Sequence, residues 1–381
     1  MNTRRGLYGP RLFLYPFWYY VYMSETRTKH FVDYLKKHWL TLSFVLGFIS
    51  DALMLNQVDS LSDNLILLAY VLLATFSLLF FYAGVAGRLG EKISHKLRKY
   101  MPGVMQYSFG GILSGMLIFY GRSGDWVTGA PFLLLILSVV FGNELVHKRS
   151  DRLVYHIALY FVGIFTYMVL ILPVLFGVMG DFMFIVSGVV ALIVVTIVVQ
   201  ILYKIVPNFM RINTRRVILI IGAIYTTFNV LYFTAVIPPI PLSLTKLEMA
   251  HLVTKPSTGV YQVTTEIPPW WRTLPFMRPV FHPSDGTLSC FARVYAPAKL
   301  STEIYHRWEY KKVGGSWQER GRIEYPIVGT NKGGYRGYTT VSNVTDGFWR
   351  CSVETARGQV LGRTTVEVRG GQPQNLVTQS E

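Results

Sequence analysis

Long runs of apolar residues fill positions 39–237, whereas residues 288–369 alternate between apolar and polar positions. A helix needs about 20 apolar residues to cross a bilayer. Seven segments meet this requirement, namely Trp39–Leu55, Asn64–Ala86, Gly103–Tyr120, Val127–Leu145, Val154–Phe176, Phe182–Tyr203 and Val217–Ile237. The pattern therefore predicts a polytopic α-helical membrane bundle of about seven spans.

The alternation that begins at Leu288 has a period of two residues, which is typical of strands with one buried face. In one such segment Ile304, His306 and Trp308 alternate with Tyr305, Arg307 and Glu309. Short alternating strands with frequent turns predict a small antiparallel, immunoglobulin-like β-sandwich. Because its core would be thin, the strand-like segment Val260–Ile267 is expected to add an edge.

These patterns divide the chain into five parts. They are a cytoplasmic or interfacial segment (1–38), a transmembrane domain (39–237), a Pro-rich membrane-proximal linker (238–287), a β-sandwich (288–369) and a frayed tail (370–381). The nine prolines from Pro238 to Pro283 argue against a long helix in the linker. Trp270 and Trp271 suit the outer membrane interface, or they pack on the next domain.

The distribution of Lys and Arg predicts the orientation, because positive residues resist translocation. The connections on the side of the N-terminus carry 19 of them, and the alternate connections carry only Arg122. The N-terminus is therefore expected in the cytoplasm and the sandwich outside. The aromatic segment Leu12–Met23 is interpreted as lying in the inner interface.

Composition supports a membrane protein and excludes other classes. The chain is 51% hydrophobic and 15% charged, whereas soluble domains carry about 25% charged residues. Disorder and a coiled coil are excluded. Most of the +16 net charge flanks the apolar runs, so it indicates a lipid bilayer as the partner and no nucleic acid.

Several short motifs resemble a known family. In the β region they are Ile304–Trp308, Gly334–Thr339, Gly347–Arg350 and Gly358–Arg363; in the membrane region they are Gly47–Asp51, Val58-Asp59 and Asn143-Glu144. The chain is thereby similar to bacterial membrane proteins that carry the domain of unknown function 2914. The resemblance implies a bacterial membrane protein with a β domain, and it implies no activity.

Catalytic signatures are missing from the sequence. It has no Walker loop, His-Glu-x-x-His, Gly-x-Ser-x-Gly or Cys-x-x-Cys motif. The eight His are scattered without metal-ligand spacing. His306 is interpreted as a packed core residue. The sequence thus predicts no cofactor and no metal, and it favours a protein that is not an enzyme.

Three polar residues fall within or at the end of the predicted spans, where polarity is costly. Asp51 and Asn229 have matching depths and are candidates for a proton or ion relay, although Asp51 is more simply interpreted as reaching the outer interface. Glu144 is expected to pair with Lys148 at the end of its helix. Gly111-x-x-x-Gly115 permits close packing within the bundle or with a partner subunit.

The predicted sandwich offers a candidate binding face and a candidate disulfide. Residues 288–369 carry 13 Lys and Arg against seven acids. Arginines and aromatics on strand faces can bind carboxylate or phosphate, and the candidates are Tyr305, Arg307, Arg336, Tyr338 and Arg350. A basic surface without a ligand is the alternative. Cys290 and Cys351 lie on apolar faces and are expected to form a disulfide in an oxidising compartment; two buried thiols are the alternative.

The sequence therefore favours a binding or scaffold protein of the bacterial inner membrane, with its β-sandwich in the periplasm. Its ligand would be a partner protein, another membrane-protein subunit or an anionic envelope polymer. A transporter that uses Asp51 and Asn229 is the alternative, and a membrane-embedded enzyme is the third.

Overall fold

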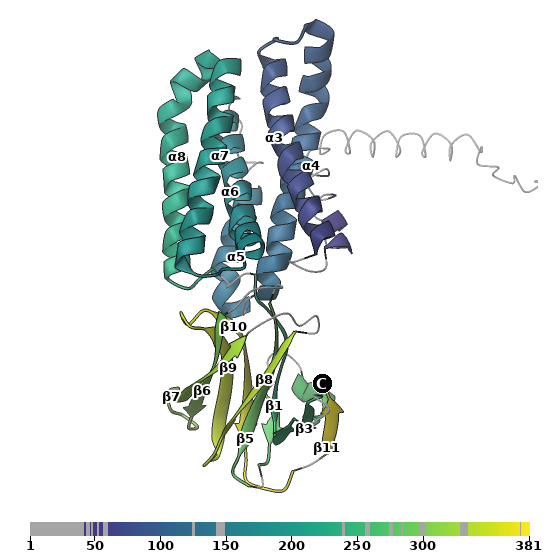
Figure 1. Ribbon diagram of the computed structural model, residues 1–381, viewed down its shortest axis with the longest axis vertical. Coiled ribbons are helices and arrows are strands. Elements are labelled where there is room, and N and C mark those ends of the chain that lie inside the picture. The colour runs from purple at the N-terminus through teal and green to yellow at the C-terminus, as the bar shows by residue number, and fades with distance from the viewer. Residues whose placement is uncertain are drawn as a thin grey trace, which may run out of the picture.

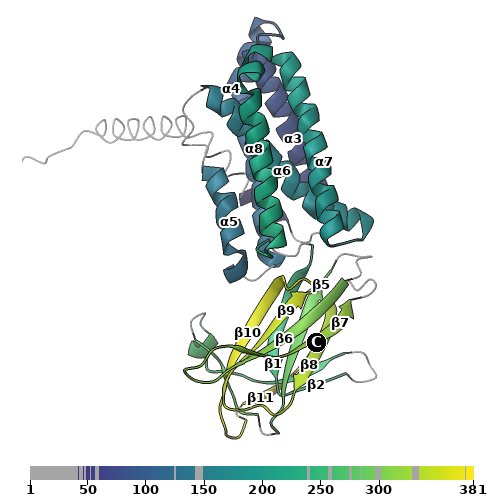
Figure 2. The same ribbon diagram turned by 90° about the vertical axis from the view of Figure 1, so that its left-hand side faces the viewer.

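The structure is a computed structural model with helices in its first half and strands in its second (Figures 1 and 2). It describes residues 60–381 except 124–125, 142–148, 238–240, 256–259, 274–276, 284, 297–301, 328–333 and 374, together with 42, 46, 49–51 and 53–55. The predicted segment 1–38, and most of the first predicted span, lie outside the described residues.

The helical region contains α3 to α8. Their bounds are α3 Leu61–Val85, α4 Glu91–Ser123, α5 Trp126–Phe141, α6 Arg149–Phe176, α7 Asp181–Ile205 and α8 Pro207–Phe233. Four of these helices, α3, α6, α7 and α8, are long and apolar enough to cross a membrane. In lipid a backbone must satisfy its hydrogen bonds within the segment, so even the β-branched run of α7 is helical. The chain thus has the character of a membrane protein.

Only four of the described helices qualify as candidate spans, which is fewer than the seven predicted. Helix α5 has 16 residues, which at about 1.5 Å per residue is shorter than the hydrocarbon core. Helix α4 has 33 residues and begins with the basic turns that contain Lys92, Lys96 and Lys99. Its apolar half is also rich in Gly and Ser, which lowers its mean hydropathy.

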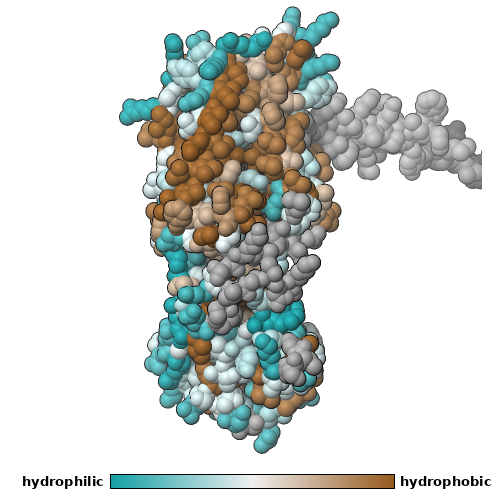
Figure 3. Space-filling model, in the orientation of Figure 1, coloured by the Kyte–Doolittle hydropathy of each residue, from teal (hydrophilic) through white to brown (hydrophobic). Residues whose placement is uncertain are grey.

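On the face shown in Figure 3, apolar side chains cover the sides of the helices, and polar side chains cover the end that lies away from the strands. At that end Arg88 donates hydrogen bonds to the Lys204 and Ile205 carbonyls, at 2.9 and 3.3 Å. These contacts join the α3–α4 turn to the last turn of α7. The basic connections and the strands therefore lie at opposite ends of the bundle.

The strands form three sheets. The strands are β1 Ser243–Ala250, β2 Leu252–Thr254, β3 Gln262–Glu266, β4 Val280–Phe281, β5 Leu288–Tyr295, β6 Thr302–Lys311, β7 Gln318–Ile327, β8 Tyr335–Val341, β9 Gly347–Thr355, β10 Val360–Val368 and β11 Leu376–Ser380. Their orders are β1-β5-β8, β4-β10-β9-β6-β7 and β11-β3-β2. The immunoglobulin-like character stays a prediction.

Strands extend beyond the predicted sandwich on both sides. The predicted linker contains β1 to β4, and β1 pairs with β5 along its whole length. The predicted tail contains β11, which pairs with β3 near the expected edge segment Val260–Ile267. Proline prevents a long helix but permits short strands between the prolines, so strands also form in the segments predicted as linker and tail.

The core of the β region lies between the first two sheets. Cys290 of β5 and Cys351 of β9 form a disulfide there. Trp308 and Trp349 pack in the same buried cluster. Ile304, His306 and Trp308 are all fully buried, as their alternation predicted. The opposite face of β6 consequently points away from this core.

The turn between β9 and β10 contacts the helical bundle. Arg357 forms an ion pair with Asp181 at the start of α7, and its guanidinium lies 4.5 Å from the centre of the Tyr232 ring in α8. The Gln359 amide donates a 3.0 Å hydrogen bond to the Ile237 carbonyl. The β region is therefore fixed to the bundle by side-chain contacts as well as by the chain.

Candidate functional site

The five-stranded sheet has an outer face rich in arginine. On β6 this face carries Tyr305, Arg307 and Glu309, because Ile304, His306 and Trp308 point into the core. On β9 it carries Arg350, which is opposite Glu309 in the antiparallel pairing. The structure thus brings the predicted residues Tyr305, Arg307 and Arg350 to one face.

Arg350 is the centre of this face. Its guanidinium stacks on the Trp317 ring at 3.6 Å from the ring centre, and it lies 3.4 Å from a Glu309 carboxylate oxygen. Its side chain is 14% exposed. Stacking and partial burial hold the charged group in one orientation and reduce the screening by water.

Three further arginines surround Arg350, and the four are here called the arginine cluster. Burial lowers the pKa of Arg350; Glu309 opposes this change, and the charges of Arg363, Arg307 and Arg278 lower the pKa further. The positive charges of these three arginines are therefore close enough to act on Arg350. Grouped positive charges attract anions.

Glu354 partly neutralises one side of the arginine cluster. Its buried carboxylate lies 3.4 Å from Arg307 and 2.8 Å from Arg322. Arg322 also stacks on the Tyr305 ring at 4.1 Å. The Tyr305 hydroxyl donates to Glu303, and this hydrogen bond raises its pKa to about 12. Tyr305 thus supports Arg322 and remains a neutral phenol.

The other two predicted binding residues lie elsewhere. Arg336 and Tyr338 are on β8, which pairs with β5 in the other sheet. The Tyr338 ring makes an edge contact with Tyr261, which precedes β3, with the ring centres 6.2 Å apart. Arg336 and Tyr338, which were expected at a sheet edge, therefore lie on the edge strand of a different sheet from Tyr305, Arg307 and Arg350.

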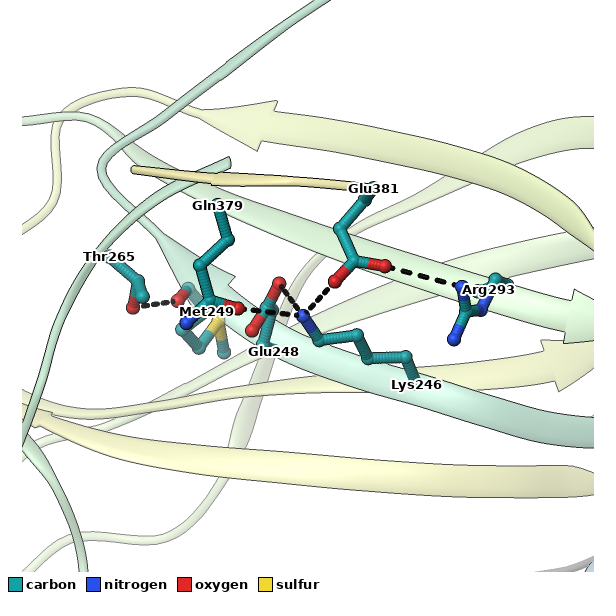
Figure 4. Close-up of polar contacts among 7 residues, drawn as sticks. All are labelled: Lys246, Glu248, Met249, Thr265, Arg293, Gln379 and Glu381. Atoms are coloured by element: carbon teal, nitrogen blue, oxygen red, sulfur yellow. Dashed lines mark hydrogen bonds and ion pairs between the residues drawn. The ribbon is translucent and has the colours of Figure 1, made fainter. Parts of the chain in front are cut away.

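On that other sheet, Glu381 occupies a basic position (Figure 4). Its carboxylate lies 2.5 Å from Lys246 and 3.3 Å from Arg293. Lys246 also contacts Glu248 and Gln379. Hydrogen bonding to Glu381 and Glu248 raises the pKa of Lys246 in spite of its partial burial. Since acids already occupy these basic groups, this face is a weaker candidate for an external anion.

The intramembrane candidates do not form the predicted pair. Asp51 is completely buried and accepts a hydrogen bond from Ser114 of α4, so its interpretation as an interfacial residue is wrong. Asn229 donates to the Tyr225 carbonyl of its own helix. Glu144 lies outside the described residues. Helix packing, which is not visible in the sequence, determines that Asp51 faces α4.

The disulfide is accompanied by a buried imidazole. Cys290, His306 and Cys351 place their possible ligand atoms within 4.8 Å of one another, and among the described residues they alone do so. Metals bind the thiolate form of cysteine, and these sulfurs are bonded to each other. Burial lowers the pKa of His306 to about 3, so its imidazole is neutral. In the oxidised protein this group is structural.

The Trp270 and Trp271 side chains, in the turn η2 Trp270–Thr273, are 75% and 49% exposed. This exposure disfavours the alternative in which the pair packs on the β region. The placement at the membrane interface stays a prediction.

Sequence reasoning missed three contributors to the face. Arg278 lies in the Pro-rich segment, Trp317 in the turn before β7, and Arg363 on β10. The alternation of β10 was an available signal for Arg363, whereas only the pairing of distant segments places the other two beside Arg350.

Comparison with known proteins gives one result. No curated protein and no solved structure matches the chain. Residues 301–368, which include β6 to β10, match the family described as "Protein of unknown function (DUF2914)". The match excludes the helical region, although the sequence resemblance extended there. It includes Arg307, Arg350 and Arg363 but not Arg278. The chain therefore carries a DUF2914 domain in its β region.

Proposed function

We propose that the protein is a membrane-anchored binding protein whose arginine cluster captures an anionic polymer. The helical region, which includes four candidate spans among its described helices, supplies the anchor. The location would be a bacterial inner membrane, with the N-terminus in the cytoplasm and the β region in the periplasm. The concentration of basic connections at the end of the bundle away from the strands supports this orientation.

One observation carries the proposal. The positive charges of Arg278, Arg307 and Arg363 act on Arg350. The Glu309 carboxylate contacts the Arg350 guanidinium directly. This group of guanidiniums, with Arg350 held by stacking on Trp317, suits phosphate or carboxylate groups that arrive from outside.

The extended surface favours a polymer over a single small anion. Arg278 is exposed, and its guanidinium lies 4.6 Å from the centre of the Phe348 ring at one side of Arg350. Arg307 is 32% exposed. Basic groups distributed over β6, β9 and β10 can contact successive charges of a chain.

The test uses the full protein in lipid nanodiscs and measures the affinity for polyphosphate, poly-glutamate and neutral dextran. We expect Arg278→Gln and Arg307→Gln each to weaken binding to at least one anionic polymer roughly tenfold, as the loss of a charged hydrogen bond implies. Arg322 remains beside Glu354 in Arg307→Gln, which limits damage to the fold. Binding should also weaken with salt.

The matched control is Arg336→Gln on the other sheet, which should bind like the unaltered protein. The proposal is overturned if neither anionic polymer binds the unaltered protein at low salt. It is also overturned if Arg336→Gln loses as much affinity as Arg278→Gln and Arg307→Gln do. A protein that co-purifies with the unaltered chain and is lost in Arg307→Gln would assign the face to a protein partner instead.

A further inference from the structure

A completely buried carboxylate lies within the helical bundle, away from the arginine cluster. Asp51 precedes α3, and its side chain contacts α4 through the hydrogen bond that Ser114 donates to Oδ2. The Ser114 hydroxyl also lies 3.0 Å from the Gly111 carbonyl. Asp51 is thus enclosed by protein at a depth where most side chains are apolar.

Two glycines of α4 create the space for this contact. A Cβ at Gly111 would lie 2.7 Å from the Tyr70 ring, and one at Gly115 would lie 2.6 Å from Leu67 and 3.2 Å from Leu55. Any larger residue would push α3 or the segment around Leu55 away. The Gly-x-x-x-Gly motif therefore packs within the bundle and places Ser114 against Asp51.

The polar groups around Asp51 are oxygens. The Tyr70 hydroxyl is close enough for the two groups to interact electrostatically. Ser50 lies 3.4 Å from the Tyr70 hydroxyl and 3.5 Å from the Tyr107 hydroxyl. Among the described residues, these two phenols are the other titratable groups of the cluster, and no ion pair to Asp51 occurs.

One carboxylate oxygen remains available. Within the described part of the chain, Asp51 Oδ1 is buried and has no hydrogen-bond partner. A carboxylate in apolar surroundings carries its charge at a high cost unless a cation neutralises it. Hydroxyl and carbonyl oxygens near a carboxylate are ligands that hard cations accept.

We propose that Asp51, with Ser114 and Tyr70, binds a small monovalent cation, either a proton or Na⁺. The bound cation neutralises the carboxylate and keeps the segment around Leu55 packed on α4. The site lies in the helical region, so it is independent of polymer binding by the β region. It gives the membrane part a chemical role beyond that of an anchor.

The experiment measures thermal unfolding of the full protein in nanodiscs. One series varies pH in sodium-free choline buffer, and a second varies Na⁺ at fixed pH with constant ionic strength. A ligand that binds only the native state raises the melting temperature. We expect the unaltered protein to respond in one series, which identifies the cation.

Asp51→Asn keeps the shape of the side chain but removes its charge, so the corresponding response should be lost. Glu91→Gln changes an exposed acid in the first turn of α4 and should retain the full response. Because the β region contains titrating groups of its own, the informative quantity is the difference between the unaltered protein and Asp51→Asn. The proposal is overturned if the two respond alike in both series.

Ser114→Ala is the second variant, and it retains the carboxylate if Asp51→Asn fails to fold. The half-effect concentration is the cation concentration that gives half of the maximal change in melting temperature. Loss of a hydrogen bond to a charged group should change this concentration roughly tenfold. An unchanged half-effect concentration in Ser114→Ala would overturn the assignment of this site.

Discussion

Thr339 forms hydrogen bonds with two buried side chains in the core of the β region, Trp308 and His306, and its replacement by valine should destabilise this region strongly. Its hydroxyl accepts a 2.9 Å hydrogen bond from the Trp308 indole and makes another of 2.9 Å with Nδ1 of His306. Valine has nearly the same shape, so the change removes both hydrogen bonds and leaves little empty space.

The magnitude follows from the burial of both partners. Trp308 and His306 are fully buried, so water cannot replace the lost hydroxyl. Each buried polar atom that loses its hydrogen bond costs about 1–3 kcal/mol. Thr339→Val should therefore lower the free energy of opening by about 2–6 kcal/mol. Thr339→Ser keeps the hydroxyl and should cost about 1 kcal/mol for the lost methyl group.

Amide hydrogen exchange in the full protein measures this effect locally. Peptides from β6 and β9 report the opening of the β region separately from the helices. Thr340→Val is the control, because Thr340 is exposed and its hydroxyl pairs with Ser289 at 2.9 Å on the other face of β8. If Thr339→Val costs no more than this control, the hydrogen-bond reasoning is refuted.

Three other changes have expected outcomes. Replacing Cys290 and Cys351 with alanine should lower the opening free energy in the same exchange assay by about 4 kcal/mol, because the bond spans 61 positions; a loss below about 1 kcal/mol would contradict this. Burial lowers the pKa of His306 from 6.5 to about 3, so the unfolded chain binds the proton at a higher pH than the folded protein does. The free energy of unfolding should therefore be unaffected above pH 6.5. It should fall by about 1.4 kcal/mol for each pH unit between pH 6.5 and about pH 3. His306→Gln should reduce this slope, and an equally steep profile would point to other groups. Gly111→Ala should lower the free energy of unfolding by about 1–3 kcal/mol through overpacking, and the melting temperature should fall. Gly222→Ala has no atom within 4 Å of its added Cβ and should not lower the melting temperature. Equal effects of the two substitutions would refute the close-packing argument.

The pattern of apolar and polar residues predicted those structural features that depend only on residues near one another in the chain. The alternation of Ile304, His306 and Trp308 predicted the buried face of β6, and therefore also that Arg307 points outward. The apolar runs predicted α3, α6, α7 and α8. These features need only the period of the pattern and the preference of each residue for water or lipid.

Features that depend on distant pairing could not be derived in this way. Arg336 was grouped with Arg307 as a candidate binding residue, because nothing in its strand reveals that β8 joins β5 in the other sheet. Asp51 was expected at the interface, since one helix alone does not show which side meets α4. Strand β1 was missed because its partner, β5, lies more than 30 positions away along the chain.

The contact between Arg357 and Asp181 has a consequence for the reach of the β region. A domain on a free tether would sweep out a wide volume above the bilayer. Here the contacts to α7 and to Ile237 hold the β region, and with it the arginine cluster, in one position relative to the helices. Neighbouring copies in one membrane would then present their clusters in a common plane. A long anionic chain that lies along this plane would contact several copies at once, and its avidity would exceed the affinity of any single copy.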